Sequence, residues 1–216
     1  MVRNRRISLL IKYSFDKVMS FFGLILFFPI FFVVGLILKI QREDVFYLQE
    51  RVGFQGENIF VYKFTTMPKG SEKYGIISTS KDTRPTPLGR FLRKTKINEL
   101  PQLINVVKGE MSFIGPRPLV RSQIAEVLTD TEIVDYYKMH PGITGAGSLY
   151  YHHEDNLLSE IHDKLKYYRE VIIPKKQQLE KIYAEHWNLL LDIKILILTL
   201  LVVIFGKIRI EEEFMK

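Results

Sequence analysis

The stretch VMSFFGLILFFPIFFVVGLIL, from Val18 to Leu38, decides the fold, because it is apolar almost throughout and Ser20 is its only ordinary polar residue. A helix rising about 1.5 Å per residue would extend roughly 30 Å over this stretch, the thickness of the hydrocarbon core of a bilayer. A secretory signal peptide fits poorly, since the apolar part is too long and the following KIQREDVF offers no small-residue cleavage site. The stretch therefore predicts a membrane segment that stays on the mature protein.

Pro29 lies near the middle of this segment and predicts a kink, because proline donates no backbone hydrogen bond and its ring crowds the preceding turn. Two interpretations fit a kinked segment: a single membrane-spanning helix, or a re-entrant helix with both ends on the cytoplasmic face. Basic residues on both flanks favour the re-entrant helix, since positive charge marks the cytoplasmic side. These residues are Arg3, Arg5, Arg6, Lys12 and Lys17 before the segment and Lys39 after it.

The C-terminal third predicts further helices. Leu189–Phe205 is apolar but contains Asp192 and Lys194, which favours an interfacial or buried helix over a membrane span. Upstream, apolar residues recur at helical spacing from Leu157 to Tyr168, and again after Pro174, which predicts two amphipathic helices separated at that proline. We expect an α+β fold, mostly helical with little sheet, made of a membrane-anchoring helix over residues 1–40 and a cytoplasmic-face domain over residues 41–216.

The amino-acid composition excludes several classes of protein and of active site. The 216 residues carry a net charge of +7 and are 47% hydrophobic, with no cysteine. This content excludes intrinsic disorder, a disulfide framework, a thiolate nucleophile and cysteine-based metal sites. The basic balance leaves nucleic acid, anionic lipid and anionic small substrates as partners.

Most of the net positive charge lies between Lys69 and Lys108, where the chain has nine basic residues and three acidic ones. A solvated charged surface would explain such a run. However, Pro85, Pro87 and Gly89 place several of these cations on turns that can converge on an anion, which favours a phosphate-rich ligand. Nucleic acid is disfavoured because the interleaved aromatic residues of a stacking platform are missing.

Arg117 stands between Pro116 and Pro118 in the sequence GPRP. The two prolines restrict the backbone and orient a guanidinium, which binds phosphate in a bidentate manner. The alternative is a structural turn whose arginine pairs with a surface carboxylate.

Several blocks of the chain together resemble the bacterial sugar transferase family, the small monotopic phosphoglycosyl transferases. The longest is DTRPTPLGRFLRKTKINELPQLINVVKGEMSFIGPRP, from Asp82 to Pro118, and HPGITG follows it. Shorter matches are Phe15-Asp16, Gln49, Arg51, Gly53, Gly56 and Lys63-Phe64.

The resemblance implies transfer of a sugar-1-phosphate from a UDP-sugar to a polyprenol phosphate such as undecaprenyl phosphate, with Mg²⁺ and release of UMP. The setting would be the cytoplasmic face of a bacterial inner membrane, in exopolysaccharide or lipopolysaccharide biosynthesis. The resemblance also supports the re-entrant helix. Self-association and other glycan-assembly enzymes are further partners to expect, and nucleic acid is not.

The resemblance also suggests roles for single residues. Glu99 would hold Mg²⁺, and Lys63 and Arg117 would bind phosphate. Further cations would come from Arg84, Arg90 and Arg93. The family's nucleophile is an aspartate directly before the glutamate, and here that position is Asn98.

An asparagine amide is too weak a nucleophile to copy a covalent aspartyl mechanism. Three outcomes stay open: direct attack by the lipid phosphate, replacement by another carboxylate, or a catalytically silent membrane protein that binds substrates or organises assembly. Glu154 and Asp155 are the candidate replacements.

Two further departures are Thr65, where the family usually has arginine, and the run from His152 to Asp155. Adjacent side chains point in different directions, so this run predicts a solvated loop or local structural pairing more than a metal site, although it could also compensate for Asn98.

Overall fold

The computed structural model describes residues 2–74, 82–125 and 127–206. Lys81 of the basic stretch lies outside the described residues, as does the side chain of Arg3. The described part is mostly helical, with two small two-stranded sheets, as expected from the sequence.

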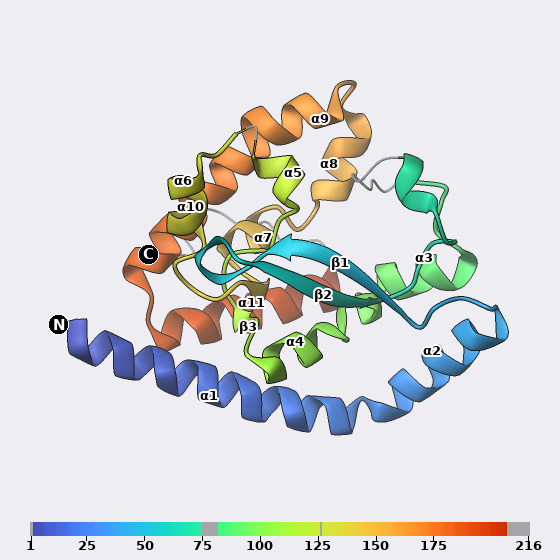
Figure 1. Cartoon of the computed structure of the whole chain (residues 1–216), viewed down its shortest axis with the longest axis horizontal. Coiled ribbons are helices and arrows are strands. Elements are labelled where there is room, and N and C mark those ends of the chain that lie inside the picture. The colour runs from blue at the N-terminus through green and yellow to red at the C-terminus, as the bar shows by residue number, and fades with distance from the viewer. Residues whose placement is uncertain (1, 75–81, 126, 207–216) are drawn as a thin grey trace.

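The apolar N-terminal stretch forms two helices, α1 (Val2–Leu26) and α2 (Phe28–Ile40), which meet at an angle of 60°. The bend falls at Phe27, whose ψ of 4° departs from helical geometry, and Pro29 lies in the first turn of α2. A helix tolerates proline in its first turn, because a backbone N–H at that position would have no partner within the helix. Figure 1 shows the two helices as a bent arm along the lower edge of the molecule.

Among the described residues, no single helix combines the length and the apolar composition of a membrane crossing, whereas the bent pair meets both requirements together. Large apolar side chains of this pair are exposed, which is unusual for a surface facing water alone. They include Phe15, Phe21, Phe22, Leu26, Phe28 and Phe32.

An antiparallel hairpin follows, made of β1 (Phe46–Val52) and β2 (Asn58–Phe64), with the short 3-10 turn η1 (Phe54–Gly56) between them. Gln49 pairs with Val61 and Tyr47 with Lys63 in the register. Because side chains alternate between the two faces of a strand, Gln49, Arg51, Val61 and Lys63 share one face of the hairpin. A second 3-10 turn, η2 (Ser71–Tyr74), follows the hairpin.

The basic middle of the chain folds into α3 (Pro87–Lys94), η3 (Ile97–Glu99), α4 (Gln102–Lys108) and β3 (Ser112–Ile114). The Thr86 hydroxyl caps α3 by accepting from the Gly89 backbone N–H at 2.9 Å. Gly89 packs so closely that a Cβ there would lie 2.0 Å from the Thr66 carbonyl oxygen. Helix α4 packs along α1 (Figure 1).

Strand β3 pairs in parallel with β4 (Gly142–Thr144), so this small sheet holds the GPRP and PGITG segments side by side. The Gly142 backbone N–H donates to the Pro116 carbonyl at 3.0 Å. A side chain at Gly142 would collide with the backbone of Gly115, which explains why small residues fill both loops.

The remaining helices lie around the hairpin: most form an arc above it in Figure 1, and the last one runs below it, on the side of α1. They are α5 (Arg121–Ile124), α6 (Asp130–Tyr136), α7 (Ala146–Tyr150), α8 (Glu154–Glu160), α9 (Lys164–Tyr167), the π-helical turn η4 (Tyr168–Ile172), α10 (Ile173–His186) and α11 (Leu189–Phe205).

The predicted separation of two helices at Pro174 is wrong. The helical path breaks between Glu160 and Lys164, and it then runs through the π-helical turn directly into α10. Pro174 lies in the first turn of α10, where the wider preceding turn accommodates a residue that donates no hydrogen bond. Helix α11 has the predicted bounds, with Leu191, Asp192 and Ile195 buried on one side.

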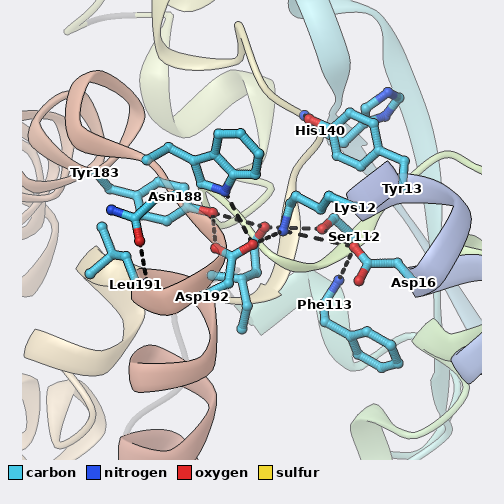
Figure 2. Close-up of polar contacts among 12 residues, drawn as sticks. Lys12, Tyr13, Asp16, Ser112, Phe113, His140, Tyr183, Asn188, Leu191 and Asp192 are labelled. Carbon is cyan, nitrogen blue, oxygen red and sulfur yellow. Dashed lines mark hydrogen bonds and ion pairs between the residues drawn. The ribbon is translucent and has the colours of Figure 1, made fainter. Parts of the chain in front are cut away.

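A buried polar network joins α1 to α11 and β3 (Figure 2). The Lys12 ammonium lies between two carboxylates, 2.7 Å from Asp192 Oδ2 and 3.8 Å from Asp16 Oδ2. Asp16 also accepts a hydrogen bond of 2.5 Å from the Ser112 hydroxyl, at the start of β3. Tyr183 of α10 donates to Asp192 Oδ1 at 2.6 Å. The network fixes α1 against the strand that leads into GPRP.

Candidate active site

Three elements that are distant in sequence bring Lys63, Glu99 and Arg117 together. Lys63 is on β2, Glu99 ends η3, and Arg117 follows β3. Glu99 Oε1 lies 3.2 Å from Arg117 Nη2 and 3.7 Å from Lys63 Nζ. All three side chains are mostly buried, with the Arg117 side chain the most exposed at 30%.

The pKa of each group in this cluster depends on burial and on the charges of the other groups. Burial opposes ionisation of Glu99, but Arg117, Lys63 and Lys96 outweigh it and hold the pKa of Glu99 well below its usual range. Burial lowers the pKa of Lys63 to about 7, against the attraction of Glu99. The pKa of Arg117 is raised, chiefly by Glu99. The Glu99 carboxylate is therefore ionised at neutral pH, whereas the Lys63 ammonium loses its proton around neutral pH.

Arg51 adds a cation that the sequence reading noted only as part of the resemblance. Its guanidinium donates to the Pro118 carbonyl at 3.1 Å and to Gln49 Oε1 at 2.5 Å. Burial, and then the nearby Arg117, lower the pKa of Arg51 to about 10. The period-two alternation that places Arg51 and Lys63 on one face of a hairpin is the signal that could have identified it.

A small pocket lies between the hairpin and GPRP. Its walls are Arg51, Val61, Lys63, Gln102, Arg117 and Pro118. Three cations and an amide thus surround a space whose nearest partner of opposite charge is Glu99. Partly desolvated positive charge in excess attracts an anion more strongly than the same charge in water. The space measures about 10 Å³, room for one water or one oxygen atom, so it suits a single phosphate oxygen and not a whole phosphate group.

The other predicted phosphate ligands are engaged within the protein. Arg84 Nη2 pairs with Asp82 Oδ2 at 2.6 Å, and its Nη1 donates to the Ser71 carbonyl at 3.2 Å. Arg90 donates to the Pro85 carbonyl at 2.8 Å. These two arginines do not line the pocket, and their contacts order the turn before α3.

Arg93 lies nearer to the cluster than Arg84 and Arg90. Its Nε donates to the Thr66 hydroxyl at 2.9 Å, and it interacts electrostatically with both Glu99 and Asp155. The pKa of Arg93 is lowered, and burial of the side chain is the main cause. Arg93 is therefore placed to extend the positive field of the pocket towards α8.

Asn98 occupies the middle of η3, directly before Glu99. Lys96 precedes it with a φ of 59°, a left-handed conformation that turns the chain sharply between α3 and η3. The Asn98 side chain is buried, and its Oδ1 has no hydrogen-bond partner within the described part of the chain. The Thr65 hydroxyl is buried without a partner in the same part of the structure.

Glu154 and Asp155 have different surroundings. Glu154 Oε2 forms a short contact with the buried Lys176 ammonium, which links α8 to α10. Asp155 is exposed on the first turn of α8, within electrostatic reach of Lys96, Arg117 and Arg93. Glu154 also interacts electrostatically with Arg117, so both carboxylates act on the cluster, but Glu154 is held by its ion pair with Lys176.

The His152–Asp155 run does not form a metal site. His152 Nδ1 bonds the Leu149 carbonyl at 2.9 Å, and the His152 and His153 rings lie 3.9 Å apart. In residues 2–74, 82–125 and 127–206, no three His, Asp or Glu side chains converge as metal ligands would.

Comparison with known proteins identifies the family. The model of the bacterial sugar transferase family matches residues 7–206. The exopolysaccharide production protein ExoY of Rhizobium meliloti is 34% identical over 158 residues, which cover 65% of this chain and 69% of the relative.

Two longer relatives have names that state a reaction. The UDP-glucose:undecaprenyl-phosphate glucose-1-phosphate transferase of Klebsiella pneumoniae is 32% identical over 197 residues, covering 89% of this chain and 40% of the relative. The UDP-N-acetylgalactosamine-undecaprenyl-phosphate N-acetylgalactosaminephosphotransferase of Aeromonas hydrophila is 37% identical over 140 residues, covering 62% and 33%. This chain thus corresponds to less than half the length of either. It belongs to the bacterial sugar transferase family.

Proposed function

We propose that this chain transfers a sugar-1-phosphate from a UDP-sugar to a polyprenol phosphate such as undecaprenyl phosphate, with release of UMP. The observation that carries the proposal is the convergence of Arg51, Lys63 and Arg117 on a pocket beside the ionised Glu99. The chemistry named for the Klebsiella and Aeromonas relatives supports it. The reaction would begin the assembly of a surface glycan on its lipid carrier.

The cations would hold the donor diphosphate and the leaving UMP. Arg117 presents a planar guanidinium that can bind two phosphate oxygens at once. Lys63 has a pKa of about 7, so its side chain is protonated in about half of the molecules at pH 7. Positioned positive charge stabilises the oxygen charges that grow as a phosphoryl group transfers. The bond from the acceptor phosphate oxygen to the sugar-side phosphorus forms while the bridging bond to UMP breaks.

The donor set fits Mg²⁺, because this ion binds one or two carboxylates together with substrate phosphates and waters and does not need an all-protein cage. Glu99 would hold it, since its carboxylate stays ionised and its two ion pairs both engage Oε1. When bound, Mg²⁺ neutralises diphosphate charge and polarises the phosphorus that is attacked.

We further propose that the protein lies at the cytoplasmic face of a bacterial inner membrane, with α1 and α2 dipping into one leaflet. The 60° bend and the exposed apolar side chains of this pair support the proposal. Helix α11 would lie at the interface, with Leu190, Ile193 and Phe205 exposed to lipid.

The chain contains no cysteine, so single-cysteine variants report sidedness cleanly. Arg6→Cys and Arg42→Cys should both label only from the cytoplasmic side in intact cells. Labelling of the two positions from opposite sides would contradict the re-entrant arrangement.

Asn98 favours a one-step transfer, in which the lipid phosphate attacks the donor directly while Asn98 and Glu99 position the groups. Asp155 is the better placed replacement nucleophile, because Glu154 is held by Lys176. If Asp155 served, Asp155→Asn would abolish turnover, and enzyme without acceptor would release UMP in stoichiometric amount. We expect neither result.

A catalytically silent membrane partner is the second candidate, favoured by the amide at position 98. UMP release from a panel of UDP-sugars, with undecaprenyl phosphate and Mg²⁺ in detergent, separates the two. Glu99→Gln should lose activity while Glu57→Gln, a matched change at an exposed position, keeps it. No release by the unmodified protein with any sugar would favour the silent partner.

A further inference from the structure

Gln102 has an unusual position for an amide. It is the first residue of α4, its side chain is only 2% exposed, and it lines the small pocket together with Arg51, Lys63 and Arg117. Its Nε2 has no hydrogen-bond partner within the described residues. A buried NH₂ group without an acceptor is costly, so its presence in a native structure calls for a partner that is absent from the folded chain itself.

Asn105, three residues further along the same helix, shows what a structural amide looks like in this protein. Its Nδ2 donates to the Phe60 carbonyl and to Glu110 Oε2, both at 2.7 Å, and its Oδ1 accepts from the Tyr62 backbone N–H at 3.0 Å. Asn105 thus ties α4 to β2 with all its groups used. Gln102 makes no comparable set of contacts, although it is equally buried.

The surroundings of Gln102 indicate which acceptor it would meet. The pocket presents the donors of Arg51, Lys63 and Arg117, and positively charged walls select an acceptor that carries negative charge. A neutral NH₂ group can donate a directed hydrogen bond to the ligand without adding another positive charge. Further positive charge would be unfavourable here, because burial and Arg117 already lower the pKa of Arg51.

We infer that Gln102 donates a hydrogen bond to a phosphate oxygen of the bound nucleotide, as a binding residue of the same pocket. This inference rests on the proposed function, because it takes the donor to be a nucleoside diphosphate sugar. It assigns to α4 a direct contact with the ligand, in addition to the cations supplied by the hairpin and by GPRP.

The test is the pair Gln102→Leu and Asn105→Leu, each replacing a buried amide by an apolar side chain. Gln102→Leu should bind UMP and inorganic pyrophosphate at least about tenfold more weakly by calorimetry in detergent, as expected for one lost hydrogen bond to a charged oxygen. Its thermal stability without ligand should equal or exceed that of the unmodified protein, since no internal bond is lost. Asn105→Leu should be clearly less stable.

The outcomes separate the inference from the proposed function. If the unmodified protein binds neither probe, the proposed function fails and the inference with it. If it binds both and Gln102→Leu binds them equally well, only the inference fails. A loss of stability in Gln102→Leu like that in Asn105→Leu would show that the amide serves the fold, which also overturns the inference. In turnover, the loss should appear as a raised KM for the UDP-sugar.

Discussion

Binding of phosphate should weaken as pH rises above 7, because Lys63 loses its charge in that range. Burial lowers the pKa of Lys63 to about 7 in the folded protein, from 10.5 for an ordinary lysine. If the ligand requires the ammonium form, its apparent dissociation constant rises as the protonated fraction falls. That fraction is about one half at pH 7 and about 3% at pH 8.5, so affinity should drop about 15-fold between these values.

Other groups near the ligand do not reproduce this slope. The pKa of Glu99 is held well below its usual range, and the pKa of Arg51 is about 10, so both stay charged between pH 7 and 8.5. The phosphate of UMP has a pKa near 6 and changes little over the same interval. Stability should respond in the opposite direction, because the unfolded chain keeps the Lys63 proton up to about pH 10.5 while the folded chain releases it. The unfavourable burial of this ammonium is therefore relieved as pH rises.

The assay is calorimetric binding of UMP at pH 7, 7.75 and 8.5 with the unmodified protein and with Lys63→Arg. An arginine stays charged throughout, so the variant should bind with an affinity that is nearly independent of pH. The unmodified protein should take up a proton on binding near pH 8, visible as a dependence of the binding enthalpy on the buffer. Equal slopes in the two proteins, or no slope in the unmodified one, would refute the reasoning.

Two further predictions concern the packing that supports the site. Lys12→Met leaves Asp16 and Asp192 buried without their ammonium partner. The free energy of unfolding, measured by denaturant titration in detergent, should therefore fall by about 3–5 kcal/mol. A fall below about 1 kcal/mol would mean that the network contributes little. Gly89→Ala places a Cβ 2.0 Å from the Thr66 carbonyl oxygen, so α3 must move and phosphate affinity should fall with it; unchanged affinity and stability would show that α3 is not held where the structure places it.

Local signals in the sequence predict the apolar N-terminal and C-terminal helices well. The apolar composition gives the helix Leu189–Phe205, and Pro29 predicts an interruption, which the structure places two residues earlier at Phe27. The interpretation of Pro174 as a break is wrong because a π-helical turn precedes it, with Tyr168 and Ile172 packed into the core. Packing between distant helices determines that turn, and no local pattern reports it.

The site is less accessible to sequence reasoning. The resemblance points to Lys63, Glu99 and Arg117, but their contact depends on three elements that only the folded chain brings together. Arg51 joins them because the register of the hairpin places it on the same face as Lys63, and that register depends on the turn at residues 53–57.

The N-terminal network shows the same limit. Lys12 and Asp192 are 180 residues apart, and nothing in the sequence around either one indicates that they form a pair. Their pairing explains why both charges are tolerated there. It also shows that α1 is built to dock on α11 and β3, whatever surrounds its other face.

The most direct measurement follows the sugar-side phosphorus itself. UDP-sugars labelled at this phosphate are incubated with the protein, Mg²⁺ and undecaprenyl phosphate, and label is counted in the lipid and aqueous fractions while UMP is quantified. The account predicts that for one sugar of the panel the label enters the lipid in amounts equal to the UMP released, and that Arg117→Ala prevents both. Label that stays in the aqueous fraction with every sugar would contradict it.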